Sequence, residues 1–338
     1  MRSSSTRSMS GRRPFCAAFS INFSGAKTLL SAVTQTFLGA ETLSDPQAVT
    51  TPYAFLGVPF GPAYEAWEYG AAAGAADAVR RTSHERAYAR FLHHWNFDIG
   101  EPQFEDGRPN VTDLGNIAVN VRAPEQIVED TIAVLKPLVQ AGVVPLVMGG
   151  MDSVPPLLVA PFEGVEEINV LQIDAHIDFR DEINGRRDGF SSPMRRIRDY
   201  ACVKELVHLG TRSIGSARRE DVEAAIAAGN RFVTIRDLCN RGAQAVAEEL
   251  DLSRRWVVVL DCDGLDPSIA PGVGAIEPGG MTLIQAMTVL NHLARNNRLA
   301  GIVFTEFQPA RDLRDATAQT IIRLLLGITG LQRAPARP

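Results

Sequence analysis

The chain has 338 residues, 45% of them hydrophobic and 22% charged, so it is long enough to bury one large core, and a single α/β domain is expected. A formal net charge of −5 gives no reason to expect a nucleic-acid partner, and no apolar run approaches the roughly 18 residues of a membrane span. The four cysteines stand at wide spacings without a Cys-x-x-Cys pair, which favours free thiols in a reducing, cytoplasmic compartment.

The first 26 residues differ from the rest of the chain. They carry several arginines among many serines, and no acidic residue precedes Glu41. Three interpretations stay open: an organelle transit peptide, which would place the protein in a mitochondrion or plastid, a disordered extension, or a start codon placed too far upstream, with Met9 as one later candidate. The Arg/Pro-rich end at 333–338 is expected to be a flexible tail, which leaves 27–332 as a single folded domain.

Strands and helices are expected to alternate through this domain. Apolar and β-branched runs predict strands at 53–58, within 111–121, and at 143–148, 168–178, 206–209, 232–235, 256–260 and 301–305. Helical spacing predicts helices at 70–90, 124–142, 221–228, 243–250, 282–296 and 316–327. This alternation predicts a three-layer α/β/α fold with a central, mainly parallel sheet.

Acidic residues follow several of the predicted strands. The run that begins at 168 leads directly into Asp174, His176 and Asp178. If the backbone stays extended, every second side chain lies on the same face, so these three side chains would point together. The run at 256–260 leads into Asp261 and Asp263, which have the same spacing. Two groups of metal-ligand side chains are therefore predicted at strand ends.

Two more strand ends add acidic residues: Asp152 follows the run at 143–148, and Glu306 follows the run at 301–305. Ligands of open parallel sheets bind at the carboxyl ends of the strands, so the four ends predict one site. Buried carboxylates repel one another unless cations neutralise them. Six oxygen-rich ligands suit two hard divalent ions, manganese or magnesium rather than zinc, and such ions activate water for hydrolysis. The predicted metal ligands are Asp152, Asp174, His176, Asp178, Asp261 and Asp263.

The ordered motifs at 149–153, 174–178 and 261–267 resemble those of the ureohydrolase superfamily, which contains the arginases and agmatinases. Residues 187–196 resemble the agmatinase-like branch more than arginase. The resemblance covers about residues 37–330 and implies an arginase-like fold, a trimer or hexamer, and two manganese ions, with nickel as an alternative. A dinuclear phosphatase also uses an Asp-x-His motif, but it needs a Gly-Asn-His element that this chain lacks.

The resemblance also implies roles for individual residues. One ion would be held by Asp152, Asp174, Asp178 and Asp261, and the other by Asp174, His176, Asp261 and Asp263. Asp178 would accept a hydrogen bond from the attacking hydroxide and relay its proton, and Glu306 would receive the guanidinium of the substrate through two parallel hydrogen bonds. An ion pair with Arg311 or Arg314 is the alternative interpretation of Glu306. The expected catalytic residues are Asp178 and Glu306, and the expected substrate contacts are Glu306, Phe190, Ser192 and Trp67.

Three positions depart from the family pattern. Asp152 stands where the family usually has histidine, Met151 replaces the usual aspartate beside it, and Ser192 stands near a histidine of the relatives that is thought to shuttle protons. The expected activity is hydrolysis of a guanidino compound, agmatine or a related guanidine, to urea and an amine. The alternatives are a subunit of an N-alkylguanidine or biguanide (metformin-type) hydrolase, and a metal-poor, non-catalytic subunit that assembles with an active paralogue.

Overall fold

The computed structural model describes residues 29–64, 70–120, 123, 125–215 and 217–331. The predicted extension at 1–26, the tail at 333–338 and Trp67 lie outside the described residues. The strands are β1 Leu30–Ser31, β2 Glu41–Thr42, β3 Tyr53–Gly57, β4 Trp95–Asn96, β5 Glu101–Pro102, β6 Val111–Ile117, β7 Val144–Met148, β8 Ile168–Ile173, β9 Val203–Leu209, β10 Arg231–Val233, β11 Arg255–Asp261 and β12 Leu299–Thr305. The helices are α1 Ala75–Glu85, α2 Gln126–Gln140, α3 Pro155–Val159, α4 Pro193–Ile197, α5 Arg219–Ala227, α6 Ile235–Arg241, α7 Ala243–Glu248, α8 Leu283–Arg295 and α9 Ala316–Leu331.

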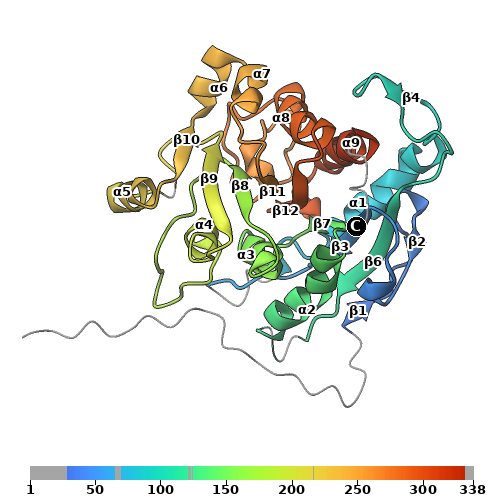
Figure 1. The fold of residues 1–338 in the computed structure, drawn as a ribbon, viewed down its shortest axis with the longest axis horizontal. Helices are drawn as coiled ribbons and strands as arrows, with labels where there is room; N and C mark the ends of the chain where they lie inside the picture. The colour runs from blue at the N-terminus through green and yellow to red at the C-terminus, as the bar shows by residue number, and fades with distance from the viewer. Residues whose placement is uncertain (1–28, 65–69, 121–122, 124, 216, 332–338) are drawn as a thin grey trace, which may run out of the picture.

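Ten of the strands form one sheet in the order β1-β6-β3-β7-β12-β11-β8-β9-β10, with β2 paired to β6 (Figure 1). All pairings in this sheet are parallel except that of β1 with β6. Helices cover both faces, so the predicted three-layer fold with a mainly parallel sheet is confirmed. The predicted strand at 168–178 is wrong in its second half, because β8 ends at Ile173.

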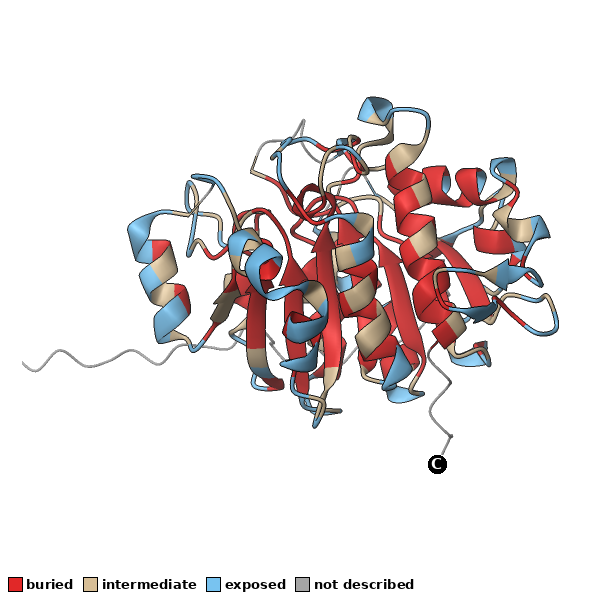
Figure 2. Cartoon of the chain, turned by 90° about the horizontal axis from the view of Figure 1, so that it is seen from above, coloured by how far each residue is buried: buried red, intermediate tan, exposed pale blue. Residues whose placement is uncertain are grey.

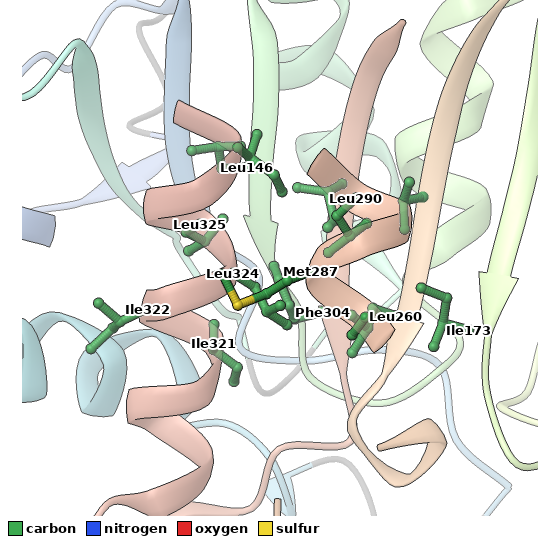
Figure 3. Close-up of a cluster of buried hydrophobic side chains, with 14 of the residues drawn as sticks. Leu146, Ile173, Leu260, Met287, Leu290, Phe304, Ile321, Ile322, Leu324 and Leu325 are labelled. Carbon is green, nitrogen blue, oxygen red and sulfur yellow. The ribbon is translucent and has the colours of Figure 1, made fainter. Parts of the chain in front are cut away.

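Two apolar cores lie on opposite faces of the sheet. In β3, Tyr53 and Phe55 face the core under α1, α8 and α9, whereas Ala54 and Leu56 face the core under α2 and α3. Figure 2 shows the strands buried in the middle of the molecule, with exposed residues on the outer sides of the helices. Full burial of a large apolar side chain contributes about 1.5–3 kcal/mol. The side chains labelled in Figure 3 belong to the first core: Leu146, Ile173, Leu260, Met287, Leu290, Phe304, Ile321, Ile322, Leu324 and Leu325.

A buried ion pair ties α1 to the sheet. The Arg80 side chain, 1% exposed, donates from Nε to one carboxylate oxygen of Asp113 in β6 (2.9 Å) and from a terminal nitrogen to the other oxygen (2.8 Å). The same carboxylate accepts hydrogen bonds from the backbone N–H groups of Phe37 (2.7 Å) and Gly115 (2.9 Å). One fully bonded carboxylate therefore joins the N-terminal segment, α1 and β6.

The strand order decides where the predicted site lies. Strands β7, β12, β11 and β8 are consecutive neighbours in the sheet, and these are the four strands that lead into the predicted acidic residues. All four run parallel, so their carboxyl ends lie at the same edge. Among the described helices, none has the length and apolar character needed to span a membrane.

Candidate active site

The loop after β8 carries Asp174, His176 and Asp178. The strand ends at Ile173, so the prediction that an extended backbone brings these residues to one face is wrong. A turn does so instead: Asp174 Oδ1 accepts a hydrogen bond from the backbone N–H of His176 (2.6 Å). Asp178 has a φ of 40°, in the left-handed region that non-glycine residues rarely adopt. Such strain persists where the surrounding structure requires it, often at functional sites.

The loop after β11 uses the same turn chemistry. Asp261 is the last residue of β11, and its Oδ1 accepts a hydrogen bond from the backbone N–H of Asp263 (2.9 Å), which lies in the short 3-10 helix Cys262–Gly264. The predicted alternation on an extended backbone is wrong here for the same reason. A Cβ atom on Gly264 would lie 2.7 Å from the backbone nitrogen of Asp174, so glycine is needed where the two loops meet.

These two loops and the segment after β7 bring together two overlapping groups of ligand atoms. In each group the atoms lie within 4.8 Å of one another: one group joins Asp174, His176 and Asp263, and the other joins Asp152, Asp174 and Asp261. His176 Nδ1 lies 3.3 Å from carboxylate oxygens of both Asp174 and Asp263. Asp174 belongs to both groups, which is the arrangement expected of a carboxylate between two ions.

Two further acidic residues lie at this cluster. The buried carboxyl group of Asp178 interacts with those of Asp152 and Asp174. The structure therefore brings all six predicted ligands together. Glu306, directly after β12, has a φ of 60°, and its Oε1 accepts a hydrogen bond from the backbone N–H of Asp152 (2.9 Å).

The surroundings of Asp152 indicate whether the cluster suits metal ions. Its side chain is 2% exposed, and Oδ1 accepts a hydrogen bond from the Thr305 hydroxyl (2.7 Å). Its Oδ2 is buried without a geometric hydrogen-bond partner among the described residues, and the acidic side chain of Asp178 lies beside this carboxyl group. An unsatisfied buried carboxylate oxygen is costly, and a cation would satisfy it. Several buried carboxylates with one imidazole also form a ligand set for hard divalent ions, so the residues fit two such ions.

Burial raises the pKa of most of these carboxyl groups, and neighbouring carboxylates add to the effect. The pKa of Asp263 rises to about 6 and that of Glu306 to about 7. The pKa values of Asp152, Asp178 and Asp261 lie well above their usual range for the same reasons. A cluster of this kind holds protons in the absence of cations, and a divalent ion displaces them when it binds.

A chain of buried hydrogen bonds fixes Asp174. Its Oδ2 accepts from Gln172 Nε2 (2.7 Å), Gln172 Oε1 bonds to His208 Nδ1, and Asn230 Nδ2 lies 2.9 Å from His208 Nε2. Burial lowers the pKa of His208 to about 3, so the ring is neutral, and it donates from Nδ1 and accepts at Nε2. Burial opposes ionisation of Asp174, but its hydrogen bonds and charge interaction with His176 outweigh burial and lower its pKa.

A cavity of about 360 Å³ lies over the cluster, and Glu306 lines it together with five of the six predicted ligands. Phe190 lines it, as expected of a substrate contact. Ser192 is fully buried, and its neighbour Ser191 lines the cavity. The described residues show no ion pair between Glu306 and either Arg311 or Arg314, so the alternative interpretation of Glu306 gains no support.

Sequence reasoning missed several polar residues around the cluster. Gln172 carried a signal, because it is a polar residue within the apolar run of a central strand, where a polar side chain must find a partner. His208, inside the apolar run predicted as a strand at 206–209, carried the same signal. Thr305 and Gln308 carried none, since their roles depend on which strands and loops are neighbours.

The fold and cluster define an α/β/α protein with an acidic cluster, able to hold metal ions, beneath a cavity. A model of the arginase family matches residues 51–330. Guanidinobutyrase of Pseudomonas aeruginosa is 26% identical over 261 residues, which cover 73% of this chain and 80% of that protein. N(1)-aminopropylagmatine ureohydrolase of Thermus thermophilus is 29% identical over 187 residues, which cover 55% of this chain and 62% of that protein.

The fold is also found in solved structures. Proclavaminate amidino hydrolase from Streptomyces clavuligerus superposes with a TM-score of 0.75 at 22% identity, covering 89% of this chain and 97% of that one. The chain therefore belongs to the arginase family, and the predicted ureohydrolase resemblance and arginase-like fold are confirmed. The family consists of hydrolases of guanidino C–N bonds that bind a dinuclear metal site, and the acidic cluster described above can hold metal ions.

Proposed function

We propose that this chain is an amidinohydrolase of the agmatinase-like branch that uses two divalent ions to hydrolyse a guanidino compound to urea and an amine. One observation carries the proposal: a cluster able to hold two ions and the carboxylate of Glu306 line the same cavity. The cluster is suited to activating water, and Glu306 is suited to binding the planar cation that water attacks.

The ion ligands follow from the family pattern and from the two groups that share Asp174. Asp152, Asp174, Asp178 and Asp261 would hold one ion, and Asp174, His176, Asp261 and Asp263 the other. Manganese is the proposed metal, with nickel as the alternative. When bound, the two ions supply a water of lowered pKa close to the substrate.

The side chains of the chain itself position the substrate and move the proton. Glu306 accepts two parallel hydrogen bonds from the guanidinium and so orients its carbon toward the cluster. A hydrogen bond with the Gln308 side chain and the N–H of Asp152 stabilise the ionised form of Glu306, which this binding requires. Asp178, buried beside Asp152 and Asp174, accepts the proton of the attacking water and passes it to the leaving amine.

The surroundings of Asp152 favour a catalytic chain over a metal-poor, non-catalytic subunit. The buried carboxylate of Asp152, which lies among the other acidic side chains, would provide the ligand atom that the family usually takes from histidine. Metal analysis of protein purified without chelator tests this directly. About two ions per chain are expected, and less than about half an ion after reconstitution would favour the non-catalytic subunit.

Paired variants test the roles of the two carboxylates. Asp178→Asn and Glu306→Gln keep side-chain size and remove charge, and each should lower urea release at least about a hundredfold. Glu105→Gln, an isosteric change at an exposed acidic residue outside the cavity, serves as the control. Full activity in Asp178→Asn would contradict the assigned proton transfer.

The relatives do not determine which chemical group the substrate carries at the end opposite its guanidino group. One is named for guanidinobutyrate, which carries a carboxylate, and another for aminopropylagmatine, which carries amines. Agmatine, guanidino acids, N-alkylguanidines and biguanides all offer a guanidino group that Glu306 can bind.

A further inference from the structure

Arg311 lines the same cavity as Glu306 and is exposed, so it lies at the mouth. It ends the short 3-10 helix Pro309–Arg311. Its guanidinium makes no hydrogen bond or ion pair with any described residue. An arginine without a protein partner at a cavity mouth can bind an anionic group of a ligand through two parallel hydrogen bonds.

The charges along the cavity are separated by depth. The four aspartates that line the cavity are buried, and Glu306 is half-buried. Apart from His176 in the cluster, Arg311 is the one basic residue among the described lining residues. The other described lining residues are uncharged, so they offer no carboxylate to a second cation: Ala71, Met151, Phe190, Ser191, Gly274, Ala275 and Gln308. Along the described lining, a substrate thus meets negative charge at the bottom and positive charge at the mouth.

Glu306 and Arg311 lie on one segment whose backbone is held by hydrogen bonds. The backbone N–H of Arg311 donates to the carbonyl of Gln308 (2.9 Å), and the N–H of Gln308 donates to the carbonyl of Gly272 (2.7 Å). The Gln308 side chain also forms a hydrogen bond with Glu306. The spacing between the carboxylate and the Arg311 backbone is therefore set by the fold, and a substrate of matching length reaches both ends.

We infer that Arg311 determines specificity by binding a carboxylate at the tail of the substrate, so the substrate class is guanidino acids rather than guanidino amines. This inference rests on the proposed amidinohydrolase function. Agmatine would place its ammonium group near Arg311, where like charges repel. A guanidino acid instead pairs its guanidinium with Glu306 and its carboxylate with Arg311.

The test compares three compounds that share a guanidino group and differ in the charge at the other end: 4-guanidinobutyrate (anionic), butylguanidine (neutral) and agmatine (cationic). Urea release by the metal-loaded enzyme gives kcat/KM for each. The wild type should prefer guanidinobutyrate to agmatine at least about tenfold. Arg311→Ala should lower this preference about tenfold, mainly through KM, and Arg311→Glu should reverse it.

Arg236→Ala, at an exposed arginine of α6 outside the cavity, is the matched control and should keep the wild-type preference. The inference would be overturned if the wild type preferred agmatine, or if Arg311→Ala kept the wild-type preference for guanidinobutyrate. In either case the release of urea would still support the proposed hydrolase function. No urea from any of the three compounds would overturn the proposed function and the inference together.

Discussion

At the scale of single residues, the position of Asp174 depends on Gln172. Gln172→Leu removes the hydrogen-bond donor to Asp174 Oδ2 and the acceptor for His208 Nδ1. Loss of such a supporting bond typically lowers metal affinity by about 10–100-fold, and the unpaired buried groups cost about 1–3 kcal/mol of stability. Titration of metal-free protein with Mn²⁺ measures the affinity.

Gln47→Leu, at an exposed glutamine, is the control for Gln172→Leu and should bind Mn²⁺ as the wild type does. Thermal unfolding shows whether both variants are folded before they are compared. A folded Gln172→Leu protein with wild-type affinity would mean that the chain of hydrogen bonds does not support the metal site.

The identity of the cluster residues could be predicted, but their geometry could not. Acidic residues at the ends of apolar runs indicated Asp174 and Asp261, since parallel strand ends share one edge. The backbone between the acidic residues depends on hydrogen bonds that their carboxylates accept from the backbone N–H groups two residues ahead. These bonds compete with extended structure. Strand periodicity alone cannot reveal that competition.

At the scale of elements, the Arg80–Asp113 ion pair joins α1 to β6. Arg80→Ala leaves the buried Asp113 carboxylate without its partner, so the free energy of unfolding should fall by about 3–5 kcal/mol. Chemical denaturation measures this change. Arg81→Ala, one residue away and 46% exposed, should change stability by about 1 kcal/mol or less. Equal effects of the two substitutions would contradict the structural role of Arg80.

Elements with long apolar periodicity were predicted well, and short ones were not. The helix expected at 282–296 is α8, and the strand at 256–260 is β11. The two-residue strand β1 went unpredicted because Leu30 pairs with Ile117, a partner 87 positions away that local pattern does not reveal. Helix α6 went unpredicted because it spans 7 residues, too few to show a period.

At the scale of the whole molecule, metal-free protein should become less stable as pH rises from about 5 to 8. The pKa values of Asp263 and Glu306 are raised by burial to about 6 and about 7, so between their unfolded and folded values the native state binds more protons than the unfolded state. Stability falls with pH wherever this holds. Hydrogen bonds with Asp174 and Asp263 raise the pKa of His176 to about 11. Above about pH 6.5 the native state therefore also holds this proton more tightly than the unfolded state, which lowers stability further as pH rises.

Thermal unfolding in chelator should therefore show a Tm that falls by roughly 2–5 °C over this range. With Mn²⁺ present the fall should disappear, because the ions bind the deprotonated ligands. A metal-free Tm that rises between pH 5 and 8 would contradict the raised pKa values.

The cytoplasmic location, the trimer or hexamer and the paralogous subunit stay predictions.

The central claim is that two divalent ions and Glu306 act on a guanidino group in one cavity. The most direct measurement is urea release by the wild type, loaded with Mn²⁺ or Ni²⁺, from guanidinobutyrate, butylguanidine and agmatine. We expect urea from at least one compound, lost on chelation and restored by the metal. A protein that holds two ions per chain and releases no urea from any of them would contradict the claim.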